Sequence, residues 1–139
     1  MRFWDSSALV TLVLDQPRTA QARELHTQDP ELVVWWASSI ECASAIARLH
    51  RDGQLSAAEE SQARDLLTTL RASWFEVQAG DAVREQALRV LRLHPLRAAD
   101  AMQLAAALEW SGSPPEGQFV SFDQRLNAAA QREGFVTVS

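Results

Sequence analysis

The most informative segment of the chain is His94-Pro95-Leu96-Arg97-Ala98-Ala99-Asp100-Ala101-Met102-Gln103-Leu104-Ala105-Ala106-Ala107-Leu108. The segment is rich in Ala, Leu and Met, which predicts a helix that begins after the proline. This helix is apolar around most of its circumference, so we expect it to be buried on several sides. Asp100 is the exception, because it precedes Leu104 and Leu108 at helical spacing and therefore shares their buried face. A carboxylate there either interacts favourably with the positive end of the helix dipole in the first turn, or it requires a compensating charge or metal ion.

Length and composition predict a single soluble domain over residues 1–139. No apolar run is long enough to span a bilayer, and the segment Met1–Asp5 lacks the basic-then-apolar plan of a signal peptide. We therefore expect a cytoplasmic protein with no membrane partner. Cys42 is the only cysteine, which excludes an internal disulfide and a thiolate metal cluster and predicts a buried, inert thiol.

The charged residues exclude several mechanisms. A net charge of −5 argues against a general polyanion binder, because such proteins usually carry a basic excess. All 13 basic residues are arginine, so the chain has no lysine for a P-loop or a Schiff base. Arginine nevertheless pairs with phosphate in a fork geometry. An acidic protein of this kind can bind a nucleic acid at one face.

Strand and helix patterns alternate along the whole chain. Ser38 and Glu41 have the spacing of a capping box at the start of one helix, and Ser56 is expected to cap the next. This alternation predicts an α/β fold with right-handed crossovers and a mostly parallel sheet covered by helices on both faces. Besides the helix of Asp100, we expect strands at 2–4, 32–36, 74–77, 119–122 and 135–138, and helices at 8–14, 19–28, 38–51, 57–72, 82–93 and 124–133, with Gly134 ending the last helix.

Four acidic residues occupy related places in this pattern. Asp5 and Asp123 each follow an apolar strand and precede a helix. Glu41 and Asp100 each lie in the first turn of a helix. Since the carboxyl ends of parallel strands and the following helix starts share one edge, we expect the four carboxylates to meet there. Each also has a simpler interpretation: the two aspartates next to strands are ordinary N-caps, and Glu41 completes the capping box.

Four carboxylates at one edge would repel one another and raise one another's pKa unless a cation neutralised them. Oxygen ligands without histidine or cysteine suit Mg²⁺ or Mn²⁺. Such an ion holds a phosphate oxygen and a nucleophilic water together, and two ions about 3.5–4 Å apart stabilise both the attacking and the leaving oxygen of a phosphodiester. The pattern therefore favours metal-dependent phosphoryl chemistry.

The segments that carry these acids resemble a PIN-domain ribonuclease and, within that family, a VapC-type toxin of a type II toxin–antitoxin pair. The resemblance covers essentially the whole chain, and its most specific part surrounds Asp100. It implies a three-layer α/β/α PIN fold and endonucleolytic cleavage of RNA that depends on Mg²⁺ or Mn²⁺. The matching segments are Trp4–Val10, Ser39–Glu41, Leu96–Ala105 and Phe122–Leu126, with Ala130 and Gly134.

The resemblance also implies roles for individual residues. Asp5, Glu41, Asp100 and Asp123 match the acidic quartet of the family. Asp5 and Asp100 are then direct metal ligands, whereas Glu41 and Asp123 bind the metal directly or through water. Any of the four can orient the attacking water.

Further expectations concern the substrate and the partners. Ser6 or Ser7 matches the hydroxyl that often follows the first aspartate of the family, and the resemblance implies a VapB-type antitoxin over the acidic pocket and a toxin homodimer. Arg97 and Arg125 are the arginines nearest the acids, where they either contact a phosphate of the substrate or balance the acidic charge.

The tryptophans and histidines are given structural roles. Trp4, Trp35 and Trp36 lie in expected strands, so core packing is favoured over the stacking of bases. The pair Trp35-Trp36 also replaces the small apolar residues usual in the family ahead of the second acid. The three histidines have no metal-ligand spacing and are expected to be solvated or locally bonded.

Two other functions remain to be compared. One is a PIN-fold interaction module with little catalysis, which the intact acidic quartet disfavours. The other is a haloacid-dehalogenase-like phosphatase, which needs a second aspartate two residues after the nucleophile and a later lysine. Ser7 stands in that position after Asp5, and the chain has no lysine.

Overall fold

All five strands of the central sheet run in the same direction in the computed structural model, which describes residues 1–139. The strand order is β3-β2-β1-β4-β5, so the sheet grows from β1 first to one side and then to the other. Phe3 of the central strand is paired with Val33 on one side and with Phe119 on the other. The expected parallel sheet is confirmed. Its strands are β1 (Arg2–Trp4), β2 (Leu32–Trp35), β3 (Phe75–Val77), β4 (Gln118–Val120) and β5 (Val136–Val138).

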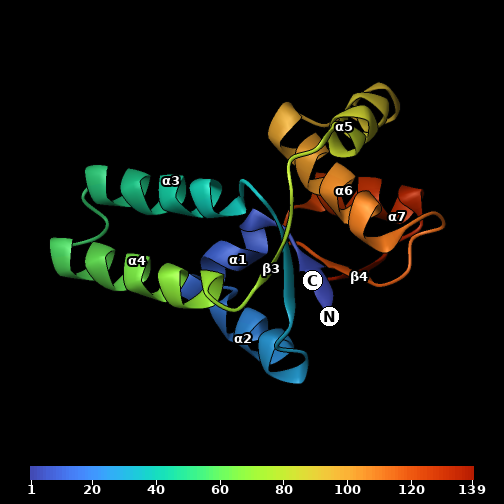
Figure 1. Cartoon of the computed structure of the whole chain (residues 1–139). Helices are drawn as coiled ribbons and strands as arrows, with labels where there is room; N and C mark the ends of the chain where they lie inside the picture. The colour runs from blue at the N-terminus through green and yellow to red at the C-terminus, as the bar shows by residue number, and fades with distance from the viewer.

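Two layers of helices cover the sheet (Figure 1). Side chains alternate between the faces of a strand, so Phe3 packs in the core beneath one helical layer and Trp4 packs beneath the other. The three-layer α/β/α architecture is therefore confirmed. The first layer contains α1 (Ser6–Val13), α2 (Thr19–Gln28), α3 (Ser38–Arg51) and α4 (Ala57–Arg71), and the second contains α5 (Asp81–Leu93), α6 (Ala98–Ser111) and α7 (Gln124–Glu133).

The helix of Asp100 is α6, which is buried on most of its surface, as its composition predicts. It packs against β2 and β3 of the sheet, against α5 on its outer side and against α7. The residues from Gln103 to Leu108 are all buried. Gly134 ends α7, also as predicted, because its left-handed backbone (φ 107°) lets its N–H donate to the Ala130 carbonyl.

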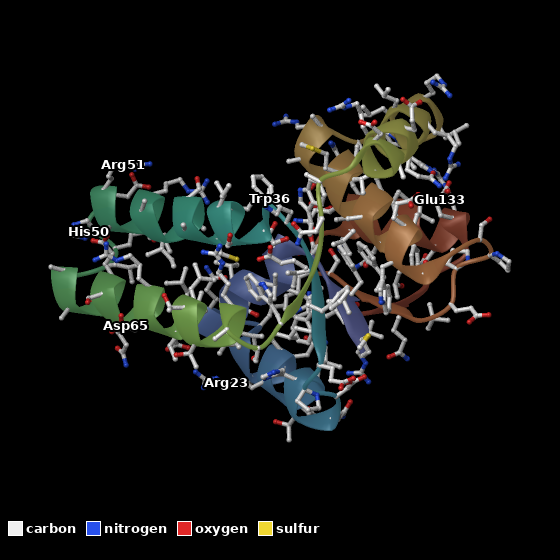
Figure 2. All side chains as sticks on the ribbon, in the orientation of Figure 1. Arg23, Trp36, His50, Arg51, Asp65 and Glu133 are labelled. Atoms are coloured by element: carbon white, nitrogen blue, oxygen red, sulfur yellow. The ribbon has the colours of Figure 1, made fainter.

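Helices α3 and α4 form an antiparallel hairpin that extends beyond the sheet, with His50 and Arg51 near its tip (Figures 1 and 2). The cap expected from Ser56 is confirmed and is a full capping box. The Glu59 N–H donates to the Ser56 hydroxyl at 3.1 Å, and the Ser56 N–H donates to the Glu59 carboxylate at 3.0 Å. No helix in the structure is both long enough and apolar enough to cross a membrane.

The capping box predicted at Ser38 and Glu41 is wrong. The N-cap of α3 is Ala37, and no side chain caps this helix. The physical reason is competition between partners, because Ser38 and Glu41 both accept hydrogen bonds from Gln103 of α6. A buried tertiary contact therefore replaces the local one.

Two aromatic predictions also need correction. Trp4 and Trp35 are buried, but Trp36 is 46 % exposed because β2 ends at Trp35 and the chain turns there. His94 is buried, and its Nε2 lies 2.8 Å from the carboxylate of Glu133. That partner is 39 residues away, so this histidine is neither solvated nor locally bonded.

The prediction for Cys42 is confirmed. Its side chain is buried among apolar residues of the first helical layer. Burial raises the pKa of the Cys42 thiol to about 12, and the negative charges of Glu41 and Asp5 act in the same direction. The thiol is therefore protonated and unreactive at neutral pH.

Candidate functional site

Asp5 lies at the carboxyl end of the central strand and starts α1. Its carboxylate accepts hydrogen bonds from the Ser7 hydroxyl at 2.8 Å and from the Ala8 N–H at 3.4 Å, which confirms its interpretation as an N-cap. The side chain is only 3 % exposed, and it has no basic partner. Burial raises the pKa of Asp5 to about 7 against the opposing effect of its hydrogen bonds. The structure thus holds a carboxylate whose charge is largely uncompensated.

Two serines join the end of β1 to the end of the neighbouring strand β4. The Ser7 hydroxyl accepts from the Phe122 N–H at 3.0 Å, and the buried Ser121 hydroxyl accepts from the Asp123 N–H at 3.0 Å. The carboxylate of Asp123 caps α7 by accepting from the Leu126 N–H at 3.0 Å. These bonds fix Asp5 and Asp123 at the same edge of the sheet. The N-cap interpretation of Asp123 is also confirmed.

Glu41 belongs to a second hydrogen-bonded group, which joins α1, α3 and α6. The Ser6 hydroxyl donates to Glu41 at 2.7 Å, and the Gln103 amide donates to the other carboxylate oxygen at 2.9 Å. The same amide lies 3.1 Å from the Ser38 hydroxyl and 3.4 Å from the Ser6 hydroxyl. Gln103 is 1 % exposed, and its own carbonyl oxygen has no partner. These contacts turn the Glu41 carboxylate toward the start of α1.

Sequence reasoning missed Gln103, Ser121 and the bond that Ser38 makes to α6. A signal for Gln103 was present, because it is a polar residue three positions after Asp100 in an otherwise apolar helix. No comparable local signal marks Ser121. Its partners are fixed by the pairing of β1 with β4, which brings residues 114 positions apart in the chain together.

Asp100 is half-buried in the first turn of α6, where the sequence placed it. It shares a polar hollow of about 530 Å³ with Asp123, Arg97 and Arg125, and Pro95 and Gln124 complete the wall. Burial raises the pKa of Asp100, the charges of Asp123 and Glu41 raise it further, and Arg97 opposes them. Three of the four acids therefore influence one another here, and both predicted arginines face this hollow.

The four carboxylates thus lie at one edge of the sheet, in two hydrogen-bonded groups and one open hollow. No three acidic, histidine or cysteine side chains are arranged as a group that could hold a metal ion. The donors nevertheless fit a hard divalent cation in kind, because they are carboxylate and hydroxyl oxygens without sulfur or imidazole. Burial raises the pKa of both Asp5 and Asp100, so a bound cation would offset the cost of ionising these two carboxyl groups.

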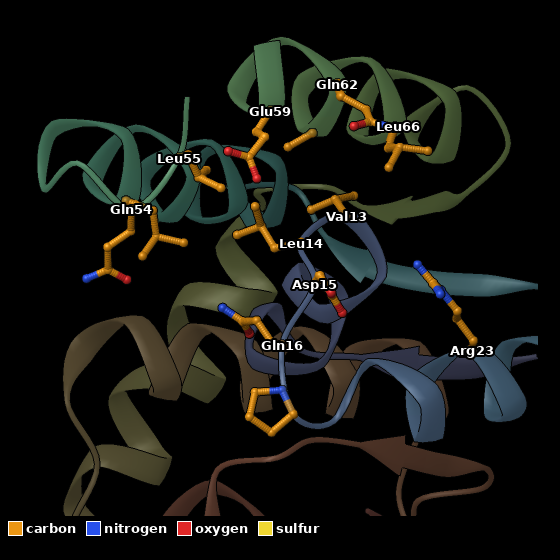
Figure 3. Close-up of a pocket in the computed structure, with 13 residues that line it drawn as sticks. Val13, Leu14, Asp15, Gln16, Arg23, Gln54, Leu55, Glu59, Gln62 and Leu66 are labelled. Atoms are coloured by element: carbon orange, nitrogen blue, oxygen red, sulfur yellow. The ribbon is translucent and has the colours of Figure 1, made fainter. Parts of the chain in front are cut away.

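A larger hollow, of about 620 Å³, lies away from the acids (Figure 3). It opens between the end of α1, helix α2 and the α3–α4 hairpin, where Leu14, Leu55 and Glu59 line its wall. None of the predicted site residues borders it. Size therefore does not identify the reactive site of this molecule. The carboxylate-bearing edge is the candidate site because of its chemistry.

The position of the acids in the fold agrees with a comparison of the sequence with protein-family models. The model described as PIN domain matches residues 2–131, from β1 to α7 and across all four acids. The chain belongs to the PIN-domain family. PIN domains are nucleases that generally use divalent metal ions. No curated protein matches the chain in a search of their sequences.

Solved structures with the same fold include a toxin and a toxin–antitoxin complex. VapC20 from Mycobacterium tuberculosis, described as a sarcin-ricin loop cleaving toxin, has a TM-score of 0.70 at 22 % identity over 99 % of this chain and 98 % of that one. FitAcB from Neisseria gonorrhoeae has a TM-score of 0.68 at 13 % identity over 100 % and 97 % of the two chains. A toxin–antitoxin complex from Klebsiella pneumoniae scores 0.67 at 15 % identity with the same coverage. At these identities the likeness is one of fold.

Proposed function

We propose that this PIN domain is an endoribonuclease that hydrolyses RNA phosphodiester bonds with Mg²⁺ or Mn²⁺, and that it acts as the toxin of a toxin–antitoxin pair. The observation that carries the proposal is the position of Asp5 and Asp123. They follow β1 and β4, the adjacent strands between which the strand order reverses, and ligands of open α/β sheets bind at this point. Glu41 and Asp100 lie at the same edge, in the first turns of α3 and α6.

The acidic quartet is the proposed metal site. Asp5 and Asp100 are assigned as direct ligands, and Glu41 and Asp123 as ligands directly or through water. When bound, Mg²⁺ or Mn²⁺ supplies Lewis-acid stabilisation of the phosphate and lowers the pKa of a water molecule.

The protein's own side chains prepare this site. Ser7 holds the Asp5 carboxylate, and Ser6 and Gln103 hold Glu41, so the acids keep their positions without a ligand. A carboxylate oxygen left free by these bonds can accept a proton from the attacking water and orient it. Arg97 and Arg125 border the hollow of Asp100, where a guanidinium pairs well with a substrate phosphate.

The proposed partners are a VapB-type antitoxin, which places a segment over the acidic hollow and inhibits the enzyme, and a second copy of the chain in a homodimer. The antitoxin is supported by the fold, which the chain shares with the toxin–antitoxin complex from Klebsiella pneumoniae. The proposed place of action is the cytoplasm, where RNA substrates are found.

The test is cleavage of a pool of single-stranded RNA by the purified chain with Mn²⁺ or Mg²⁺, compared with EDTA. Asp100→Asn removes one charge of the quartet and is expected to abolish cleavage. Asp65→Asn is the matched control, because Asp65 is an exposed aspartate of α4 (Figure 2) outside the acidic hollow. Its activity is expected to equal that of the unmodified chain.

Cleavage that needs both the metal ion and Asp100 would establish the proposed activity. Folded protein that binds no divalent ion and cuts no RNA would contradict it. The better function would then be a PIN-fold interaction module without catalysis. Equal loss of activity in both variants would indicate damage to the fold and would require a different pair of substitutions.

A further inference from the structure

Trp36 is an exposed aromatic side chain next to the acidic edge. Of the five tryptophans it is the most exposed, although its backbone is held firmly by a hydrogen bond from its N–H to the Val77 carbonyl at 3.0 Å. Figure 2 shows it at the start of α3, beside the helices α5 and α6. A single exposed indole is common, but one that is continuous with other exposed apolar side chains often marks an interaction site.

The ring borders a hollow of about 530 Å³ with mostly apolar walls. Leu88 and Leu91 of α5 and Met102 of α6 contribute to these walls, and all three are exposed. The only charged residues in the lining are Asp81 and Arg84, whose side chains pair at 3.2 Å. Pockets for small organic ligands typically have volumes of about 300–1,000 Å³ and mostly apolar and aromatic walls with few polar groups, and this hollow has these features.

This apolar hollow adjoins the acidic site across the first turns of α6. Arg97 and Asp100 border the acidic hollow, whereas Ala98 and Met102 border the apolar one. Residues two positions apart lie on different sides of a helix, so the two hollows open on different sides of the start of α6. A nucleotide chain that places a phosphate at Asp100 can therefore place a neighbouring base beyond this helix.

A second connection passes through the hydrogen bonds of the site. Trp36 is two residues before Ser38, and Gln103 bonds both Ser38 and Glu41. The indole is thus attached by a short, rigid segment to the group that positions a proposed catalytic carboxylate. Its place relative to the acids is consequently fixed by the fold.

We propose that the hollow beside Trp36 is a base-binding subsite, in which the indole stacks on the nucleobase next to the phosphate that is cleaved. The inference rests on the proposed cleavage of RNA. Stacking on an aromatic ring is tolerant of base identity, so the subsite adds affinity and fixes register more than it selects a sequence. The positive charge of Arg97, which borders the acidic hollow at the start of α6, suits the phosphate backbone of an RNA bound there.

The test measures binding of a fluorescent single-stranded RNA to the full chain in EDTA, which prevents metal-dependent cleavage. Trp36→Ala is expected to weaken binding about 5- to 100-fold, and Trp36→Phe is expected to restore most of the affinity. Phe75→Ala is the matched control, because Phe75 is an aromatic residue of similar exposure (58 %) that lines neither hollow. Its affinity is expected to be unchanged.

The same RNA is then prepared with single abasic nucleotides along its length. At one position, the missing base should weaken binding of the RNA to the unmodified chain. The same abasic RNA should bind the Trp36→Ala variant as tightly as intact RNA does, because the missing base and the substitution remove the same contact. Equal affinity of Trp36→Ala and the unmodified chain, or a loss that is the same for every abasic RNA, would overturn the inference. So would conversion of a dimer to a monomer by Trp36→Ala in sedimentation with RNA binding retained, because the hollow would then be a contact between copies.

The base subsite and the proposed function can fail separately. Cleavage of RNA that is indifferent to Trp36 and to all abasic positions would remove the subsite and leave the ribonuclease. Base-dependent binding through Trp36 without any cleavage would support the subsite and remove the ribonuclease. Absence of RNA binding in EDTA, together with absence of cleavage with Mn²⁺ or Mg²⁺, would overturn both.

Discussion

Asp5 is the only buried acid in the molecule, and its burial has a consequence for stability. Its pKa is raised to about 7, so the folded chain disfavours the ionised form that the unfolded chain adopts above its ordinary value of 3.8. The stability contributed by this group is therefore largest at low pH and declines as the pH rises toward 7. A bound cation would offset that loss.

Replacing Asp5 by Asn is expected to stabilise the chain in EDTA at pH 8, where the native carboxylate is charged. A pKa difference of about three units sets an upper bound of roughly 4 kcal/mol. Asn keeps the oxygen that accepts from Ser7, but the cost of burying its NH2 group will reduce the gain. The measurement is urea unfolding at pH 8 and pH 5. A gain that is equal at both pH values would show that the buried charge is not its cause.

Glu133 has the opposite pH dependence. Burial tends to raise its pKa, but hydrogen bonds and charge from Arg89 and His94 outweigh burial and lower the pKa below the ordinary value of 4.5. The stabilisation from this ionised group is therefore present above about pH 4.5 and is lost as the pH falls through the lower folded value.

Glu133→Gln is expected to lower the free energy of unfolding at pH 7 by about 1–3 kcal/mol and to reduce the loss of stability on acidification. Unfolding by urea at pH 7 and pH 4 measures both effects. Glu116→Gln is a suitable control, since Glu116 is exposed and forms no ion pair. The explanation fails if the two variants have the same pH profile.

At the scale of elements, Gln103 connects three helices that are distant in the sequence. Its amide bonds Ser6 of α1, Ser38 of α3 and Glu41 of α3 from its own position on α6. The helices belong to different layers, so this side chain ties the two layers together at the carboxyl edge of the sheet. It also explains why α3 begins without a side-chain cap.

Gln103→Leu keeps the size of the side chain and removes its donors. We expect the chain to lose about 1–3 kcal/mol of stability, because the buried Ser38 hydroxyl and the Glu41 carboxylate lose a partner. Gln131→Leu is the control, since Gln131 is exposed on α7 and its bond to Thr137 joins two neighbouring segments; it should change stability by less than about 0.5 kcal/mol. Equal effects of both substitutions in urea unfolding would refute the connecting role of Gln103.

At the scale of the whole molecule, the proposed metal site can be tested without any measurement of activity. A ligand that binds only the folded chain stabilises it by about 2.7 kcal/mol at a hundredfold excess over its Kd. For a domain of this size, Mn²⁺ is then expected to raise the Tm by about 8–10 °C. Asp100→Asn should reduce this shift strongly, whereas the exposed control Asp65→Asn should retain it. A shift of the same size in both variants would place the ion elsewhere on the molecule.

Much of the fold could be predicted from local patterns. Alternating apolar strands and amphipathic helices identified the α/β class and the parallel sheet, because hydrophobic periodicity and helix capping depend on neighbours in the chain. The positions of Asp5 and Asp123 at strand ends and of Asp100 in a first turn followed from the same signals. Convergence of the acids at one edge then followed from the rule that parallel strands end together.

Packing settled the remaining features. Glu41 matched a local capping box, yet its partners are Ser6 and Gln103, which lie 35 and 62 residues away and reach it only when α1 and α6 pack beside α3. Trp36 matched a buried strand, yet it emerges where β2 ends and the chain turns into α3. In both cases tertiary packing overrides a local pattern at a low cost in free energy. Loss of a helix cap, for example, costs roughly 1 kcal/mol. The sequence therefore gives the position of an acid or an aromatic ring along an element, and contacts between elements determine what that side chain faces.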